Sequence, residues 1–199
     1  DQVVFTVPSN VAARVCPDLS EAEKQTLNRV QYQGIICASV LLKKPLAGFY
    51  VTNITADWVP FTAVIEMSAL VDPQEFGGHS LVYLPKYFAA GDPILQLSNE
   101  EIETKFLTAL GRMYPHLTRA DVVAFKISRV RNVFPLPTLN YSAMMPATET
   151  SLPGVFIVNS SHLLNGTLNV NEGIKLAEQV LPTLLAAAKT KPAALRQVA

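Results

Sequence analysis

The sequence predicts an α+β fold, in which a mixed β-sheet domain with one covering helix is flanked by partial strands and a helix of an α/β domain. Both ends of the chain contain a short apolar strand that leads into a helix, at Gln2–Val7 and Gly154–Val158. Strands that are apolar on both faces are typical of a sheet covered by helices. The middle of the chain instead combines several strand patterns with one strongly amphipathic helix, Asn99–Tyr114.

This difference between the ends and the middle predicts an inserted domain. We expect residues 18–145 to form the inserted domain, and residues 1–17 together with 146–199 to form the other. The two apolar end strands are then expected to lie close together in space.

The inserted domain is expected to contain five strands and one long helix. The strands are Gln31–Leu42, Phe49–Asn53, Phe61–Ser68, Leu81–Leu84 and Asp121–Val130. Ser98 and Glu101 have the spacing of a capping box at the start of the helix, and Pro115 ends it. Residues 132–153 contain four prolines and predict a long ordered loop. Ser20 and Glu23 form a second capping box, before a short helix.

The composition excludes several classes of protein. Apolar residues make up 49% of the 199-residue chain and charged residues 16%, which is typical of a globular protein. A net charge of zero argues against a nucleic-acid partner. The longest clean apolar run, Ile35–Leu42, is too short to span a membrane, and two cysteines cannot form a disulfide framework. We therefore expect a cytoplasmic protein. The three histidines are far apart in the sequence and predict no metal site.

Five segments, in their order and spacing, resemble the flavin amine oxidase and protoporphyrinogen oxidase superfamily. They are DQVVFTVPSNVAARVCPDL, FTAVIEMSALVDPQEFGGHSLVYLPKY, SNEEIETKFLTALGRMYPHL, VRNVFPLPTLNYSAMMP and LPGVFIVNSSHLLNGTLNVNEGIKLAEQVLP. The resemblance implies an FAD-dependent oxidoreductase that transfers a hydride from a small organic substrate to the flavin. It also implies that residues 18–145 bind substrate and that the chain ends belong to the FAD-binding domain.

The sequence departs from the family at two motifs. The GxGxxG motif of the family is absent, so the chain resembles a C-terminal part that alone is expected to be inactive. Where the family often has Gly-Asp after the last strand, this chain has Asn159 and Ser160. The cofactor-binding residues that the resemblance implies are Asn159, Ser160, Gly166, Thr167, Leu168 and Asn169. A strand that delivers polar residues to its carboxyl end, before a helix, independently suits a ligand site.

Aromatic residues supply the candidates for the substrate pocket. Tyr141 is the first, because it lies in the segment that resembles the family's return toward the flavin, and Trp58 and Tyr83 are the others. Glu66 is expected at an exposed strand position, with an internal acid as the alternative. No catalytic residue is assigned, because in this class the flavin carries the chemistry.

Two other functions remain open at this point. The first alternative is a non-catalytic binding module. The second is part of a flavoenzyme of the UDP-galactopyranose mutase type. In the second case Arg129 and Arg131 would face a diphosphate, whereas a salt-bridged sheet edge is the simpler interpretation of this pair. If one half of the cofactor domain is missing, we expect a homo-oligomer to form through the exposed apolar edges that remain, since unpaired strands invite association.

Overall fold

The chain contains two compact units, seen in a computed structural model that describes residues 2–164 and 167–189. Residues 33–133 form one unit, here called the inserted unit. Residues 1–32 and 134–199 form the other, here called the split unit. One continuous stretch of chain thus lies between the two parts of the split unit, with boundaries at 32/33 and 133/134, whereas the sequence predicted domain boundaries at 17/18 and 145/146.

The boundaries differ because two short helices pack with the chain ends. Helix α2 (Glu21–Arg29) packs on α1 (Ser9–Val15), and Leu27 of α2 is buried against Ala12 of α1. Helix α4 (Tyr141–Met144) is tied to the last strand's loop by a hydrogen bond from Tyr141. Sequence patterns locate helices, but they do not reveal which core a short helix joins.

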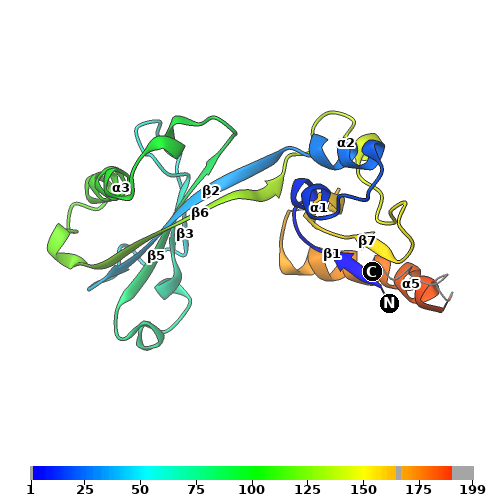
Figure 1. Cartoon of the computed structure of the whole chain (residues 1–199). Helices are drawn as coiled ribbons and strands as arrows, with labels where there is room; N and C mark the ends of the chain where they lie inside the picture. The colour runs from blue at the N-terminus through cyan, green and yellow to red at the C-terminus, as the bar shows by residue number, and fades with distance from the viewer. Residues whose placement is uncertain (1, 165–166, 190–199) are drawn as a thin grey trace, which may run out of the picture. The chain divides into compact units, whose positions relative to one another are not determined.

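The inserted unit is built on a five-stranded sheet with the order β3-β4-β5-β2-β6. Neighbouring strands β3 and β4, β4 and β5, and β5 and β2 pair antiparallel, with Ser39 opposite Tyr83 at the centre (Figure 1). The strands are β2 (Tyr32–Leu42), β3 (Val51–Asn53), β4 (Ala63–Glu66), β5 (Ser80–Phe88) and β6 (Val122–Pro135). Single 3₁₀ turns lie at Met67–Ala69, Pro73–Phe76, Pro93–Gln96 and Arg119–Asp121.

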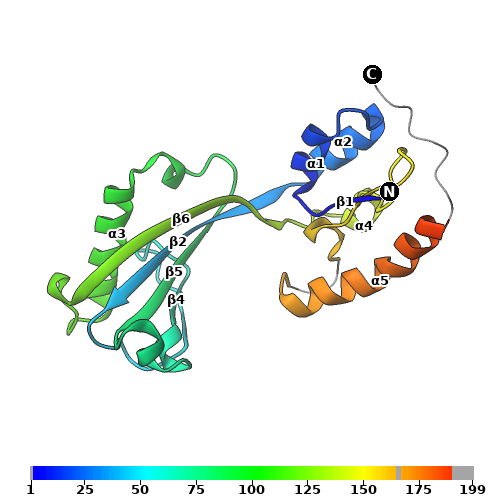
Figure 2. The same ribbon diagram turned by 60° about the horizontal axis from the view of Figure 1, so that its bottom comes forward.

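Helix α3 (Asn99–Met113) covers one face of this sheet (Figure 2). It begins at the expected capping box, in which the Ser98 and Glu101 side chains each accept from the other's backbone N–H. Its Ile102, Phe106 and Leu110 side chains are fully buried against alternate residues of β2 and β5. Burial of each such side chain contributes about 1.5–3 kcal/mol to the free energy of unfolding. The core of the unit lies in this layer between α3 and the sheet. The predicted α+β fold class is confirmed.

The split unit contains a parallel pair of strands from opposite ends of the chain. Strand β1 (Val3–Phe5) pairs with β7 (Val155–Ile157), Val3 lying opposite Val155. The expected proximity of the two end strands is therefore confirmed. A 3₁₀ turn (Ser160–His162) and then helix α5 (Val170–Lys189) follow β7.

Two features of the chain ends differ from expectation. Val3 is 49% exposed and Val4 40%, so β1 is not buried on both faces. The reason is that the described residues supply two strands here, with α1 and α2 packed near Ile157. The expected loop at 132–153 is interrupted, because β6 runs on to Pro135 and α4 follows.

Helices that could cross a membrane, which need both length and apolar character, do not occur in the described residues 2–164 and 167–189.

Candidate cofactor site

Asn159 lies two residues beyond the end of β7 and links the two ends of the chain by hydrogen bonds. Its side chain is buried, with Oδ1 accepting from the Ser161 N–H at 2.9 Å and from the Ser161 hydroxyl at 2.6 Å. Its Nδ2 donates to the Val7 carbonyl at 2.8 Å, at the turn between β1 and α1. The amide is thus engaged at both ends, and it shapes the loop after β7 rather than offering the loop a free polar group.

A network of hydroxyl groups continues from Asn159 through the split unit. Ser9 Oγ donates to Ser161 Oγ at 3.0 Å, and the Tyr32 hydroxyl donates to Ser9 Oγ at 3.2 Å. The Tyr141 hydroxyl donates to the Ser161 carbonyl at 2.8 Å. Buried polar groups are costly unless they are paired, so this network specifies one loop conformation.

Tyr141, the first candidate for a substrate residue, therefore stabilises the loop after β7 in this unit. Its side chain is 7% exposed. Burial raises the pKa of the Tyr141 phenol above its ordinary value of 10.0, and the hydrogen bond to Ser161 offsets part of that rise. A neutral phenol that donates to a backbone carbonyl positions the loop and presents no free hydroxyl.

His162 is a buried histidine that the sequence did not single out. Its Nδ1 lies 3.2 Å from the Asn159 N–H and 3.1 Å from the Asn159 carbonyl, and the ring tautomer decides which of the two it bonds. Within the described residues, Nε2 is buried and has no hydrogen-bond partner. Burial lowers the His162 pKa below 6.5, although the carbonyls of Asn159, Pro146 and Ala147 partly oppose this. Burial thus favours the neutral form of the ring.

The remaining polar residues of the predicted site lie in the loop before α5. Asn169 caps this helix, its Oδ1 accepting from the Glu172 N–H at 2.9 Å. Its Nδ2 donates to Thr167 Oγ1 at 3.2 Å. Thr167, Leu168 and Asn169 are exposed, whereas Ser160 is half-buried. Gly166 was also predicted here, and it lies outside the described residues.

This donor set fits one side of a polyhydroxylated, anionic cofactor. Ser160 and Thr167 carry hydroxyls that can donate or accept, and the α5 N-terminus favours negative charge. No carboxylate among the described residues stands in this loop. The described residues also include no cluster of His, Cys, Asp or Glu that could hold a metal ion.

The structure separates the two substrate candidates of the inserted unit. Tyr83 alternates with the buried Val82 and Leu84, so its half-buried ring lies on the sheet face opposite α3. Trp58 is 44% exposed and lies next to α3, where the Arg112 guanidinium sits 4.0 Å from its ring centre. These two side chains therefore do not line one pocket.

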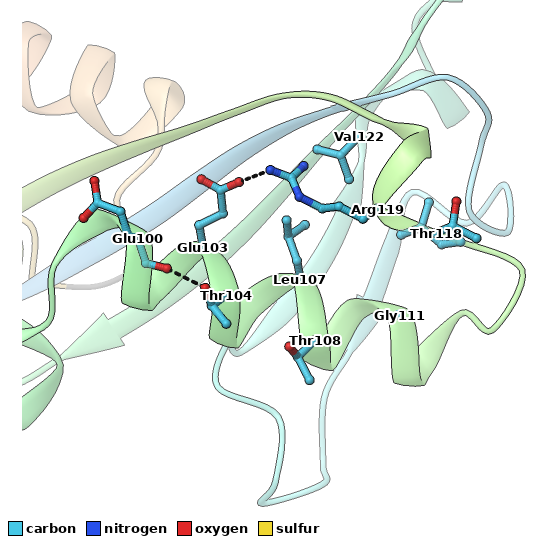
Figure 3. A pocket seen from close by; sticks show the side chains of 10 residues that line it. Glu100, Glu103, Thr104, Leu107, Thr108, Gly111, Thr118, Arg119 and Val122 are labelled. Carbon is cyan, nitrogen blue, oxygen red and sulfur yellow. Dashed lines mark hydrogen bonds and ion pairs between the residues drawn. The ribbon is translucent and has the colours of Figure 1, made fainter.

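A cavity of about 530 Å³ lies between α3 and the turn before β6 (Figure 3). Two of its charged lining residues pair with each other, since Arg119 contacts Glu103 at 2.6 Å, and Glu100 lines it as well. The Thr104 hydroxyl donates to the Glu100 carbonyl in the same wall. Sequence analysis did not predict this cavity, because its walls come from segments that approach each other only in the folded unit.

Comparisons with known proteins agree with this fold. Residues 1–176 match the family model described as flavin containing amine oxidoreductase. No match was found among curated proteins.

Solved structures are similar at low sequence identity. A protein from Exiguobacterium sp. 255-15 assigned as a protoporphyrinogen oxidase has 12% identity and a TM-score of 0.71, covering 96% of this chain and 42% of its own. A putrescine oxidase double mutant has 15% identity and a TM-score of 0.68, with 93% and 42% covered. Reduced UDP-galactopyranose mutase has 14% identity and a TM-score of 0.56, with 73% and 32% covered.

These solved structures are more than twice as long as the aligned chain, which spans at most 42% of the three described. At such identities the likeness shows the fold, and the family match carries the assignment. Since that match extends over residues 1–176, the chain belongs to the flavin containing amine oxidoreductase family.

Proposed function

We propose that the chain is the C-terminal part of an FAD-dependent oxidoreductase of the amine-oxidase type. In this proposal the split unit completes a flavin-binding domain and the inserted unit binds the substrate. The chemistry that the flavin supplies when bound is the acceptance of a hydride from a small organic molecule.

The parallel pair of β1 and β7 is the observation that carries this proposal. Parallel strands with helices around them bind ligands at their carboxyl ends. Asn159 and Ser160 stand at the carboxyl end of β7, and the network of Asn159, Ser9 and Ser161 holds that end in one conformation. The hydrogen-bonded turn that begins at Asn159 suits a cofactor that must be held in a fixed orientation.

Each polar residue has a separate role in the proposal. Ser160 and Thr167 contact the cofactor, their hydroxyls bonding its polar groups, while Asn169 caps α5 and holds Thr167. Asn159 and Tyr141 act as positioning residues, because their polar atoms are occupied by the loop itself. Leu168 supplies backbone groups next to the start of α5.

The absence of a glycine-rich motif supports the idea of a partial cofactor site. No GxGxxG occurs in the sequence, and that motif normally holds the pyrophosphate. Val3 and Val4 on β1 are exposed, as an uncovered edge of a larger sheet would be. In the proposal, a unit upstream of this chain supplies both the glycine-rich motif and the cover for β1.

The rival assignment to a UDP-galactopyranose mutase type has weaker support. It needs Arg129 and Arg131 to face a diphosphate. The Arg129 guanidinium instead donates to the Leu97 carbonyl at 3.0 Å and to Asn99 Oδ1 at 2.7 Å, before and at the start of α3. With these two partners the guanidinium links β6 to the start of α3 within the inserted unit.

The visible absorbance spectrum of the full-length gene product tests the proposal. We expect bound flavin, and Ser160→Ala together with Thr167→Ala is expected to weaken FAD binding by about tenfold, as loss of two hydrogen bonds would. Ser128→Ala, an exposed serine on β6, is the matched control and is expected to bind FAD normally. A product that stays colourless after incubation with FAD contradicts the proposal, and tight UDP binding favours the mutase type.

A further inference from the structure

A second groove flanks α3 within the inserted unit, on the other side of the ridge formed by Thr104 and Thr108. It encloses about 450 Å³ and is lined by Trp58, Lys105, Arg112 and these two threonines, among others. The volume lies in the range of small-molecule sites. All of its residues belong to one compact unit, so the groove does not depend on how the two units are arranged.

The groove combines a flat aromatic surface with two cations. The Arg112 guanidinium lies over the Trp58 ring at 4.0 Å from its centre. Lys105 precedes Arg112 by seven residues, or about 10 Å along the helix, and Thr108 stands between them on the same stripe. The ring, the two charged groups and a hydroxyl thus face one space.

The two cations lack acidic partners among the described residues. Neither Lys105 nor Arg112 forms an ion pair there, whereas Arg119 in the neighbouring cavity pairs with Glu103. Glu101, one turn before Lys105, accepts instead from the Ser98 N–H at 2.7 Å. No carboxylate lines the groove. Its charge is therefore uncompensated, in contrast to the cavity of Figure 3.

We propose that this groove binds an organic anion that joins a flat ring to a phosphate or carboxylate group. Lys105 and Arg112 would bind the anionic group, because charge-assisted hydrogen bonds to guanidinium and ammonium are stronger than neutral ones. The ring would stack on the Trp58–Arg112 pair, since guanidinium and indole both offer flat faces. The groove belongs to the inserted unit and the proposed cofactor loop to the split unit, and the inference does not depend on the proposed function.

Trp58 is the only tryptophan of the chain, so its fluorescence reports on this groove alone. Three probes separate the parts of the proposal: AMP has ring and phosphate, pyrophosphate has only charge, and adenosine has only the ring. We expect AMP to quench Trp58 fluorescence at saturation, and to bind about tenfold more tightly than either of the other two by calorimetry.

Variants make the test specific to the groove. Lys105→Ala and Arg112→Lys are each expected to weaken AMP binding about fivefold, the second because lysine keeps the charge but loses the flat face. Lys126→Ala, an exposed lysine on β6 outside the groove, is expected to bind AMP as the unchanged chain does. The proposal is overturned if AMP does not bind, if adenosine or pyrophosphate binds as tightly as AMP, or if Lys126→Ala weakens binding as much as Lys105→Ala.

Discussion

Glu66 is a buried carboxylate that holds a loop in place. It is 2% exposed, and its oxygens accept from the backbone N–H groups of Leu46, Ala47 and Gly48 at 2.9, 3.1 and 2.9 Å. Three donors converging on one carboxylate offset the cost of burying its charge. Without it, the three N–H groups of this loop between β2 and β3 would lose their acceptor, and that of the buried Leu46 would be the most costly to leave unpaired.

Replacement of Glu66 by Gln is expected to lower the free energy of unfolding by about 2–4 kcal/mol, because the new NH₂ group would face backbone donors. Urea unfolding of the whole chain measures this. Glu75→Gln, an exposed carboxylate in the same unit, is the matched control and is expected to change stability by less than about 0.5 kcal/mol. Equal stability of both variants would show that Glu66 does not hold the loop.

The expectation of an exposed Glu66 was wrong, and its strand explains why. Glu66 follows Val64 by two residues in β4, so both point to the face covered by α3. This alternation was present in the sequence. What it could not reveal was the loop that would supply three N–H groups, since Leu46–Gly48 reach Glu66 only through the folded sheet.

Glu23 is a second carboxylate with a defined role, in the split unit. Burial alone would raise its pKa, but hydrogen bonds from Ser151 and Ser20 lower it from 4.5 to about 2. The Ser151 N–H donates at 2.6 Å across a long stretch of sequence. A lowered pKa in the folded state means that the ionised carboxylate stabilises the fold.

This stabilisation is expected to be fully present above pH 4.5 and to be lost as the pH falls toward 2. The stability difference between the unchanged chain and Glu23→Gln should therefore shrink from pH 7 to pH 3, as measured by urea unfolding. Glu178→Gln on the exposed face of α5 provides the control. A Glu23→Gln difference that is the same at both pH values would refute the role of the charge.

At the scale of elements, helix starts could be read from the sequence with the greatest accuracy. Both capping boxes form where expected, at Ser20 and Ser98, because a cap depends only on residues three apart. Strand ends were less accurate, since β5 runs on to Phe88 and β6 to Pro135. Those extensions arise from pairing with β2, a partner that local patterns do not identify.

A close approach between strands gives a prediction at this scale. A Cβ atom on Gly34 in β2 would collide with the Phe88 ring of β5 and lie 2.9 Å from the Val130 carbonyl of β6. Gly34→Ala is expected to destabilise the chain by about 1–3 kcal/mol through overpacking. Gly34→Ala combined with Phe88→Leu should recover part of this loss relative to the sum of the single changes. Additive effects in thermal or urea unfolding would mean that the ring is not the obstacle.

For the whole molecule, the sequence could predict that the two end strands lie together, but not which polar atoms stay free in the candidate site. Asn159 and Asn169 were both expected to bind the cofactor, and each is engaged in structural hydrogen bonds. Trp58 and Tyr83 were expected in one pocket, and the alternation of β5 places Tyr83 on the opposite face. Residue types indicate chemistry, but only the fold decides which polar atoms remain free.

The uncovered side of the split unit predicts self-association. Val4 on β1 and Ile174, Leu181 and Leu185 on α5 are 40%, 52%, 49% and 54% exposed. Exposed apolar residues around an open strand edge favour pairing with another copy. We expect concentration-dependent oligomers in analytical ultracentrifugation, and a shift toward monomer in Val4→Lys with Ile174→Lys. If the chain without these substitutions is monomeric at all concentrations, the expectation is contradicted.

The central claim is that this chain carries one part of a flavin site whose other part lies upstream. Titration of FAD, followed by flavin fluorescence, into this chain and into the full-length gene product tests it most directly. Because the pyrophosphate contacts of a glycine-rich unit are absent here, we expect weak or no binding by the chain and stoichiometric binding by the longer product. Tight, stoichiometric FAD binding by this chain alone, or no binding by the longer product, would contradict the account.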